Sequence, residues 1–232
     1  MAVMIGFFDY TVILTYLSLV SSTTGIIVTL SGGGHPYIGA MLLLFCGLCD
    51  AFDGKVARMK KDRTKMQCNY GIQIDSLSDL VAFGVLPASI GFALFRTSDF
   101  LKTLRDNNLL EVCRFVLMGI LVLYVLAAMI RLAYFNVTEE ERQSAEGGET
   151  VRKTYTGLPV TSAAIILPSV LLLSYAIPKD IAIVYFPVVL LMAIMFVSKL
   201  QIKKPQMKHI MMMVAIGAAE AIAIAVYIYL YR

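Results

Sequence analysis

The sequence predicts an all-α polytopic transmembrane helical bundle, and three observations support this fold class. Hydrophobic residues make up 59% of the 232 positions and charged residues only 16%, whereas soluble domains are usually roughly 45–50% apolar and about 25% charged. The apolar residues gather in stretches close to the roughly 20 residues that a helix needs to cross a bilayer. The sequence has no obvious internal repeat and no long linker between these stretches. We therefore expect residues 1–232 to form one membrane-embedded domain.

Seven segments are apolar enough to form transmembrane helices. They cover residues 10–30, 37–54, 74–95, 111–135, 157–177, 181–198 and 210–230. Six or eight helices would also fit the pattern, because split helices and hairpins produce similar apolar stretches. The first segment follows no basic cluster and precedes no convincing cleavage site. We therefore expect it to be a retained helix and not a signal peptide.

The basic residues of the loops predict the orientation in the membrane. Three loops are rich in lysine and arginine, namely residues 55–70, 137–155 and 199–208. With seven spans, these loops lie on one side. The loops of the other side carry Arg96, Lys102, Arg105 and Lys179. Because cytoplasmic loops carry an excess of basic residues, we expect a multi-pass protein of the cytoplasmic membrane with these three loops inside. We expect no nucleic acid as a partner.

Four aspartates flank the first of these basic loops. Asp50 and Asp53 are three residues apart at the end of the second span, and Asp75 and Asp79 are four residues apart at the start of the third. On a helix each pair shares one face, with Cβ atoms about 5–6 Å apart. Because the loop returns the chain, the two helices are expected to be antiparallel neighbours, and their four carboxylates can converge.

Such a group of carboxylates is costly at the edge of a membrane. Insertion scales assign roughly 2.5–3.5 kcal/mol to one central charged residue, and the four also repel one another. Mg²⁺ or Mn²⁺ would offset both costs, because these ions prefer oxygen ligands, and a pair of ions about 3.5–4 Å apart can clamp a transferring phosphoryl group. The alternative is that the aspartates are helix caps or interfacial charges.

Small residues and an arginine accompany the aspartates. Gly54 and Ala57 lie on the second span, where their size lets a ligand approach the helix. Gly71 lies one turn before the third aspartate and is expected to let the two helices pack closely. Arg58 supplies a planar guanidinium group, which suits phosphate oxygens. This combination counts against the capping alternative.

The pattern D-x-x-D-G-x-x-A-R, then a spacer, then G-x-x-x-D-x-x-x-D resembles the signature of the CDP-alcohol phosphotransferase family, and every fixed position is matched. The resemblance implies a six-helix core, here with about one extra C-terminal helix, often in a homodimer. It implies two divalent cations, Mg or Mn, held by the four aspartates, with Asp79 also as the catalytic base. The residues that it implies for binding the CDP group are Asp50, Gly54, Ala57, Arg58 and Gly71.

The spacer departs from the family pattern. Twelve residues separate Arg58 from Gly71, where the family usually has about eight. We expect the additional residues to enlarge the cytoplasmic loop and to leave the metal ligands in place. The contacts of this loop with the nucleotide are left open.

Three further segments resemble phosphatidylserine synthases. They are D-S-L at Asp75 with F-G-V-L-P-A at residues 83–88, R-L-A-Y-F-N at residues 131–136, and G-L-P at residues 157–159. Tyr134 replaces a second arginine of those enzymes. The resemblance implies phosphatidyl transfer from CDP-diacylglycerol to L-serine, which gives phosphatidylserine and CMP, in a site that also contacts membrane lipid.

The acceptor site is the least specified part. Arg131 and Asn136 are candidates for binding the acceptor, and Arg131 could hold a serine carboxylate or a lipid phosphate. The alternative for Arg131 is that it extends to the membrane interface. Glycerol phosphate or inositol phosphate remain alternative acceptors. An ion transporter is disfavoured, because transporters place such groups near the midplane and often contain repeats. Glu220, deep in the last span, is protonated, paired across a dimer or groove, or facing a cavity.

Overall fold

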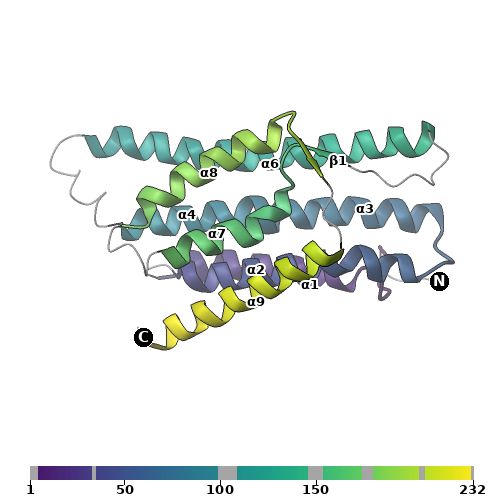
Figure 1. The fold of residues 1–232 in the computed structure, drawn as a ribbon, viewed down its shortest axis with the longest axis horizontal. Helices are drawn as coiled ribbons and strands as arrows, with labels where there is room; N and C mark the ends of the chain where they lie inside the picture. Colours follow the sequence, from purple (N-terminus) through teal and green to yellow (C-terminus); the bar gives the residue numbers. More distant parts are fainter. Residues whose placement is uncertain are drawn as a thin grey trace.

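The computed structural model describes residues 5–32, 35–98, 109–145, 154–173, 180–203 and 207–230. Most of these residues are helical, and the helices run along one bundle (Figure 1). In chain order the helices are α1 (Ile13–Leu30), α2 (Pro36–Met59), α3 (Lys65–Asp79), α4 (Leu86–Thr97), α6 (Leu109–Ala145), α7 (Ala163–Leu172), α8 (Ala182–Val197) and α9 (Met207–Leu230). The predicted all-α bundle is confirmed.

Four helices of the described part are long and apolar enough to cross a membrane: α1, α2, the combined helix Lys65–Thr97, and Glu111–Arg142 of α6. Three shorter apolar helices, Val160–Leu172, Ala182–Val197 and Val214–Val226, complete the set. They coincide with the seven predicted segments, and the chain is a multi-pass membrane protein. The third and fourth helices extend beyond the predicted spans, because the polar residues next to each span continue the helix.

Helices α2 and α3 each have a recognisable sequence signal at their start. Helix α2 begins with a proline, which fits the first position of a helix because no N–H is needed there. Helix α3 begins after a capping box: the Gln67 N–H donates to Thr64 Oγ1 at 3.2 Å, and the Thr64 N–H donates to Gln67 Oε1 at 2.9 Å. Residues 60–64 therefore make the whole turn, and half of the twelve-residue spacer belongs to α3.

Helices α2 and α3 were predicted to be direct neighbours, but they do not pack on each other. Within the described residues, α2 packs mainly on α1, and α3 packs on α1 and on the segment that follows it. Figure 1 shows α3 and α4 in line with each other, with α2 in the lower layer. The two aspartate-bearing helices are thus held by a shared neighbour, α1, and make few direct contacts.

One turn of π-helix, η1 (Leu80–Val85), joins α3 to α4 directly after Asp79. This turn and α4 enter the apolar core, where η1 packs mainly on α6, α1 and α4 and Phe83 is part of the buried cluster. Two tyrosines, Tyr124 of α6 and Tyr185 of α8, are fully buried in this core. The sequence analysis did not predict the π-helix.

A small antiparallel sheet joins two connections that are distant in sequence. Strand β1 (Thr154–Thr156) pairs with β2 (Gln201–Lys203). Gly157 follows with φ +78, and its N–H donates to the Leu200 carbonyl at 2.7 Å. A Cβ atom at Gly157 would lie 2.8 Å from the Phe196 carbonyl oxygen. Glycine is therefore required in the G-L-P segment both for its backbone conformation and for space.

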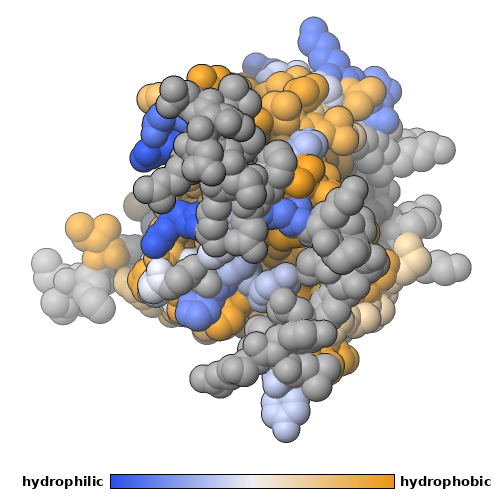
Figure 2. Space-filling view, turned by 90° about the vertical axis from the view of Figure 1, so that its left-hand side faces the viewer, coloured by the Kyte–Doolittle hydropathy of each residue, from blue (hydrophilic) through white to orange (hydrophobic). Residues whose placement is uncertain are grey.

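At the opposite end of the bundle, α4 ends next to the start of α8. The Ser98 hydroxyl donates a hydrogen bond to Asp180, and the Asp180 carboxylate accepts another from the Ala182 N–H at 3.0 Å. Figure 2 shows this end, with hydrophilic side chains lying between apolar ones. These hydrogen bonds satisfy part of the first turn of α8.

Candidate active site

The structure brings the four predicted aspartates together. Asp50 and Asp53 lie on the last three turns of α2, and Asp75 and Asp79 lie on the second half of α3. Their carboxyl groups interact electrostatically with one another, and Asp53 and Asp75 are near enough for a side-chain hydrogen bond. Asp79 is 8% exposed, and the other three are half-buried. The site thus combines four acidic groups from two helices.

Neighbouring helices hold the aspartate-bearing part of α3 from two sides. The Ser78 hydroxyl donates to the Thr15 carbonyl of α1 at 3.2 Å. From α6, Asn136 Nδ2 donates to Ser76 Oγ at 2.7 Å. These bonds lie directly beside Asp79 and Asp75. The predicted acceptor residue Asn136 is therefore adjacent to the aspartates.

The donor set suits a hard divalent cation, because carboxylate oxygens are the ligands that Mg²⁺ and Mn²⁺ prefer. In the described residues, no three His, Cys, Asp or Glu side chains already surround a point that could hold a metal ion. Asp53 Oδ1 instead accepts a hydrogen bond from the Gly54 N–H. Binding of one ion by all four carboxylates therefore requires side-chain rotation, including rotation of Asp53 away from the Gly54 N–H.

Arginines occupy the space beside both predicted glycines. A Cβ atom at Gly54 would lie 3.3 Å from Arg58 Nη1, and one at Gly71 would lie 2.7 Å from Arg63 Nη2. The expectation that Gly71 lets α2 and α3 pack closely is therefore wrong, because its free face is covered by a side chain of the connecting loop. Ala57 is half-buried on α2, and Arg58 is exposed.

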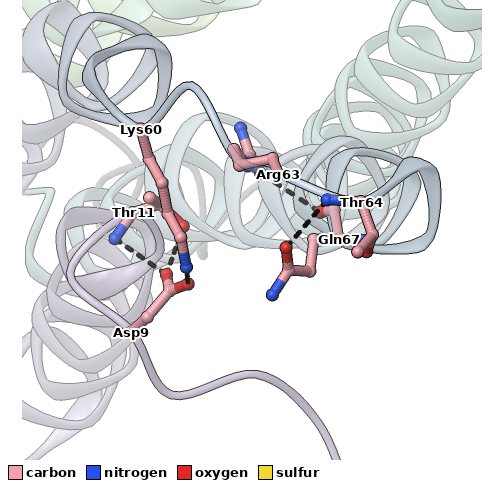
Figure 3. A network of polar contacts seen from close by, with 6 residues as sticks. All are labelled: Asp9, Thr11, Lys60, Arg63, Thr64 and Gln67. Carbon is pink, nitrogen blue, oxygen red and sulfur yellow. Dashed lines mark hydrogen bonds and ion pairs between the residues drawn. The ribbon is translucent and has the colours of Figure 1, made fainter.

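Arg63 belongs to the longer spacer and was not singled out from the sequence. Its Nη2 donates to the Gln67 carbonyl at 3.1 Å, and its Nε is buried without an acceptor. Figure 3 shows Arg63 lying against the first turn of α3, beside Thr64 and Gln67. The added spacer residues thus place a second guanidinium group against the first turns of α3, beside Gly71.

A contact with the N-terminal segment holds the end of α2. Lys60 Nζ lies 2.7 Å from Asp9 Oδ2, and Asp9 also accepts from the Thr11 hydroxyl and, at 3.0 Å, from the Thr11 N–H (Figure 3). The hydrogen bond from Lys60 is the largest cause that lowers the pKa of Asp9 from 3.8 to about 2. No sequence signal links Asp9 to Lys60, because the two are 51 residues apart.

Arg131 lies on α6 and is 6% exposed. Its Nε donates to the Leu158 carbonyl at 3.3 Å, and its guanidinium carbon lies 5.5 Å from the centre of the Phe135 ring. The alternative that Arg131 extends to the interface is wrong, because the side chain is enclosed by the G-L-P segment. Tyr134, which replaces an arginine, is exposed.

Glu220 lies apart from the four aspartates. It is 7% exposed on α9, and its Oε1 accepts a hydrogen bond from the Ser169 hydroxyl of α7. Its Oε2 is buried and has no hydrogen-bond partner among the described residues. This bond joins two helices of the same chain, so it is not the pairing across a dimer or groove that the sequence left open.

Comparison with known proteins identifies related sequences. The pattern of the CDP-alcohol phosphatidyltransferase family matches residues 10–231. The CDP-diacylglycerol–serine O-phosphatidyltransferase of Saccharomyces cerevisiae is 37% identical over 144 residues, which are 60% of this chain and 44% of the yeast protein. The Bacillus subtilis enzyme of the same name is 27% identical over 176 residues, which are 75% of this chain and 77% of that protein.

An archaeal relative has a related name. The archaetidylserine synthase of Methanothermobacter thermautotrophicus is 32% identical over 177 residues, which are 76% of this chain and 64% of the archaeal protein. The aligned part therefore spans less than two thirds of the yeast and archaeal proteins.

Proposed function

Because this chain belongs to the CDP-alcohol phosphatidyltransferase family, we propose that it transfers the phosphatidyl group of CDP-diacylglycerol to L-serine. The observation that carries the proposal is the group of four facing carboxylates on α2 and α3. The names of the relatives support serine as the acceptor. The whole chain, residues 1–232, acts as one domain.

In the proposed reaction, the serine hydroxyl oxygen attacks the phosphorus that bears diacylglycerol, and the bond from this phosphorus to the oxygen of CMP breaks. Asp79 accepts the hydroxyl proton, and CMP leaves with the bonding electron pair. Burial of Asp79 supports this role, because proton transfer is most effective where water does not compete for the base. Phosphatidylserine and CMP are the products.

The family is generally dependent on divalent metal ions. Asp50, Asp53, Asp75 and Asp79 would hold two of them, Mg²⁺ or Mn²⁺. When bound, such ions supply positive charge that offsets the charge of the diphosphate and of the departing CMP. The backbone and side chains of this chain position the substrates.

The residues beside the aspartates would bind the CDP group. Gly54, Ala57 and Gly71 present little side chain of their own, so a nucleotide that displaces the flexible Arg58 and Arg63 side chains beside the two glycines can approach both helices closely. Arg58 pairs with phosphate oxygens through its planar guanidinium group. Asp50 contributes from the preceding turn of α2.

Two residues of α6 would bind the acceptor. Arg131 pairs with the serine carboxylate, because a buried guanidinium group favours an anionic partner. Asn136 contacts the acceptor next to Asp75, which its hydrogen bond to Ser76 supports. Glycerol phosphate and inositol phosphate carry anionic groups too, so they are the competing acceptors.

The test of this function is a competition between acceptors. Purified protein receives CDP-diacylglycerol with equimolar L-serine, glycerol phosphate and inositol phosphate, and mass spectrometry identifies the lipid product. Phosphatidylserine as the main product supports the proposal. A phosphatidylglycerol phosphate or phosphatidylinositol phosphate product would exclude serine as the preferred acceptor. No lipid product from any acceptor would contradict the transferase function.

The site would face the cytoplasm at the surface of the cytoplasmic membrane. CDP and serine are water-soluble and the diacylglycerol chains remain in lipid, so an interfacial site serves both. The protein would act as a homodimer, which chemical cross-linking in membranes can test.

Labelling of the α2–α3 loop checks this orientation. A cysteine introduced by Lys61→Cys is expected to react with a membrane-impermeant maleimide only after the cells are opened, because the basic loop is cytoplasmic. The substitution is made in a protein whose four native cysteines are replaced by serine, so that only the introduced cysteine reacts. Labelling in intact cells would invert the topology.

A further inference from the structure

The third span changes its helical register immediately after Asp79. In the π-helix η1, the Leu86 N–H donates to the carbonyl of Val81, which is five residues earlier and not four. One additional residue in a turn rotates the following residues by about 100° relative to an uninterrupted α-helix. The residues before and after η1 therefore point in different directions.

This rotation separates the aspartates from the core. In an uninterrupted helix Asp75, Asp79, Leu86 and Ile90 would share one face, because their spacings of four and seven residues are helical repeats. In the structure Leu86 and Ile90 are fully buried in the apolar core, while Asp75 and Asp79 interact with the carboxylates of α2. The π-helix thus allows one continuous helix to direct Asp75 and Asp79 toward α2 and to direct Leu86 and Ile90 into the apolar core.

The proline at position 87 leaves a backbone carbonyl of η1 without its usual donor. Pro87 has no N–H, so the Phe83 carbonyl, four residues earlier, cannot accept the α-helical hydrogen bond. The hydroxyl of Tyr124 donates to this carbonyl at 2.7 Å. Phe83 and Tyr124 are both fully buried, so water does not replace the bond. Tyr124 thus supplies from α6 the donor that Pro87 lacks.

A second tyrosine makes a similar bond one turn further from the aspartates. The hydroxyl of Tyr185, on α8, donates to the Pro87 carbonyl at 2.8 Å. Tyr185 is also fully buried. Its acceptor, however, belongs to the regular helix α4 and not to η1. The described part of the chain therefore contains two fully buried tyrosine–carbonyl bonds, and the one from Tyr124 is made to η1.

We propose that Tyr124 is a positioning residue for the acidic site: by holding the Phe83 carbonyl it maintains η1, and η1 sets the direction of the Asp79 side chain toward α2. The expected effect of Tyr124 on turnover rests on the proposed function. Its effect on the geometry of the four carboxylates is independent of which acceptor is used.

The test compares Tyr124→Phe with Tyr185→Phe. Each change removes one hydroxyl from a fully buried ring, so both variants are expected to lose a similar amount of thermal stability. In the transfer assay, Tyr124→Phe is expected to lower kcat roughly tenfold to a hundredfold, because small displacements of a reacting group have effects of this size. The KM for CDP-diacylglycerol stays within about twofold, and Tyr185→Phe keeps kcat within about twofold.

A binding measurement separates this inference from the proposed function. Free Mn²⁺ is followed by electron paramagnetic resonance during titration of each protein. Tyr124→Phe is expected to weaken Mn²⁺ binding several-fold, and Tyr185→Phe to leave it unchanged. If the unmodified protein transfers no lipid, the proposed function fails, and the Mn²⁺ comparison still decides the role of Tyr124. Equal Mn²⁺ affinities in the two variants, or equal losses of kcat, would overturn the positioning role.

Discussion

Buried carboxylates occur in two parts of the bundle, and their surroundings differ. On α2 and α3, four aspartates face one another. Between α7 and α9, Glu220 has the hydroxyl of Ser169 as its partner and no facing carboxylate among the described residues. Like-charge repulsion therefore acts in the first of these two regions and not in the second. Grouping, and not burial alone, distinguishes the acidic site from Glu220.

Removal of divalent ions is expected to have the largest effect. Excess EDTA should reduce lipid transfer to background, because the four grouped aspartates need cations to offset their repulsion. Re-addition of Mg²⁺ or Mn²⁺ should restore the activity. Glu220→Gln should respond to EDTA in the same way as the unmodified protein. Full turnover in excess EDTA would remove the metal-binding role of the aspartates.

Asp79→Asn should lower kcat about 10²- to 10⁴-fold, the usual effect of losing a general base. CDP-diacylglycerol should still bind, because Asp50, Asp53 and Asp75 remain, so the loss appears chiefly in kcat and less in KM. Steady-state kinetics with varied CDP-diacylglycerol measure this. Glu220→Gln is the matched control and should keep kcat within about threefold. Near-normal kcat in Asp79→Asn would exclude Asp79 as the base.

Arg131→Ala should raise the KM for serine roughly tenfold to a hundredfold, because a hydrogen bond to a charged group contributes about 1.5–3 kcal/mol. The KM for CDP-diacylglycerol should change little. The melting temperature should also fall, because the variant loses the bond to the Leu158 carbonyl. If stability falls and the serine KM does not change, Arg131 holds only the G-L-P segment.

Asp9→Asn should have the smallest effect. The side chains of Asp9 and Lys60 are 26% and 28% exposed, and pairs near the surface contribute roughly 0.2–1 kcal/mol. Because folding lowers the pKa of Asp9 from 3.8 to about 2, the carboxylate stabilises the fold above about pH 4. This stabilisation disappears as the pH falls toward 2.

Thermal unfolding of the two proteins in detergent measures this difference across pH. The melting temperature of Asp9→Asn should be slightly lower than that of the unmodified protein by a constant amount from pH 5 to 8. The difference should vanish near pH 2. Asp62→Asn, which changes an exposed carboxylate of the same loop, is the control and should show no such difference. A gap that grows below pH 4 would contradict the assignment.

Local sequence patterns predicted much of the fold and the positions of the acidic residues. Apolar length alone identified the seven helical segments, because a bilayer sets the length of a span. Spacings of three and four residues placed Asp50 with Asp53 and Asp75 with Asp79 on shared helix faces. Both patterns depend on residues within one segment, so no knowledge of the partners was needed.

Contacts between distant segments were decided only by the tertiary structure. Lys60 binds Asp9, which is 51 residues away, and Ser169 pairs with Glu220, also 51 residues away. Each contact depends on how distant segments are placed beside one another, which no spacing within a helix specifies. The π-helix after Asp79 has the same character. The Phe83 carbonyl of this turn, which Pro87 leaves without an α-helical donor, accepts a hydrogen bond from Tyr124, 41 residues later. Only folding places that hydroxyl within reach.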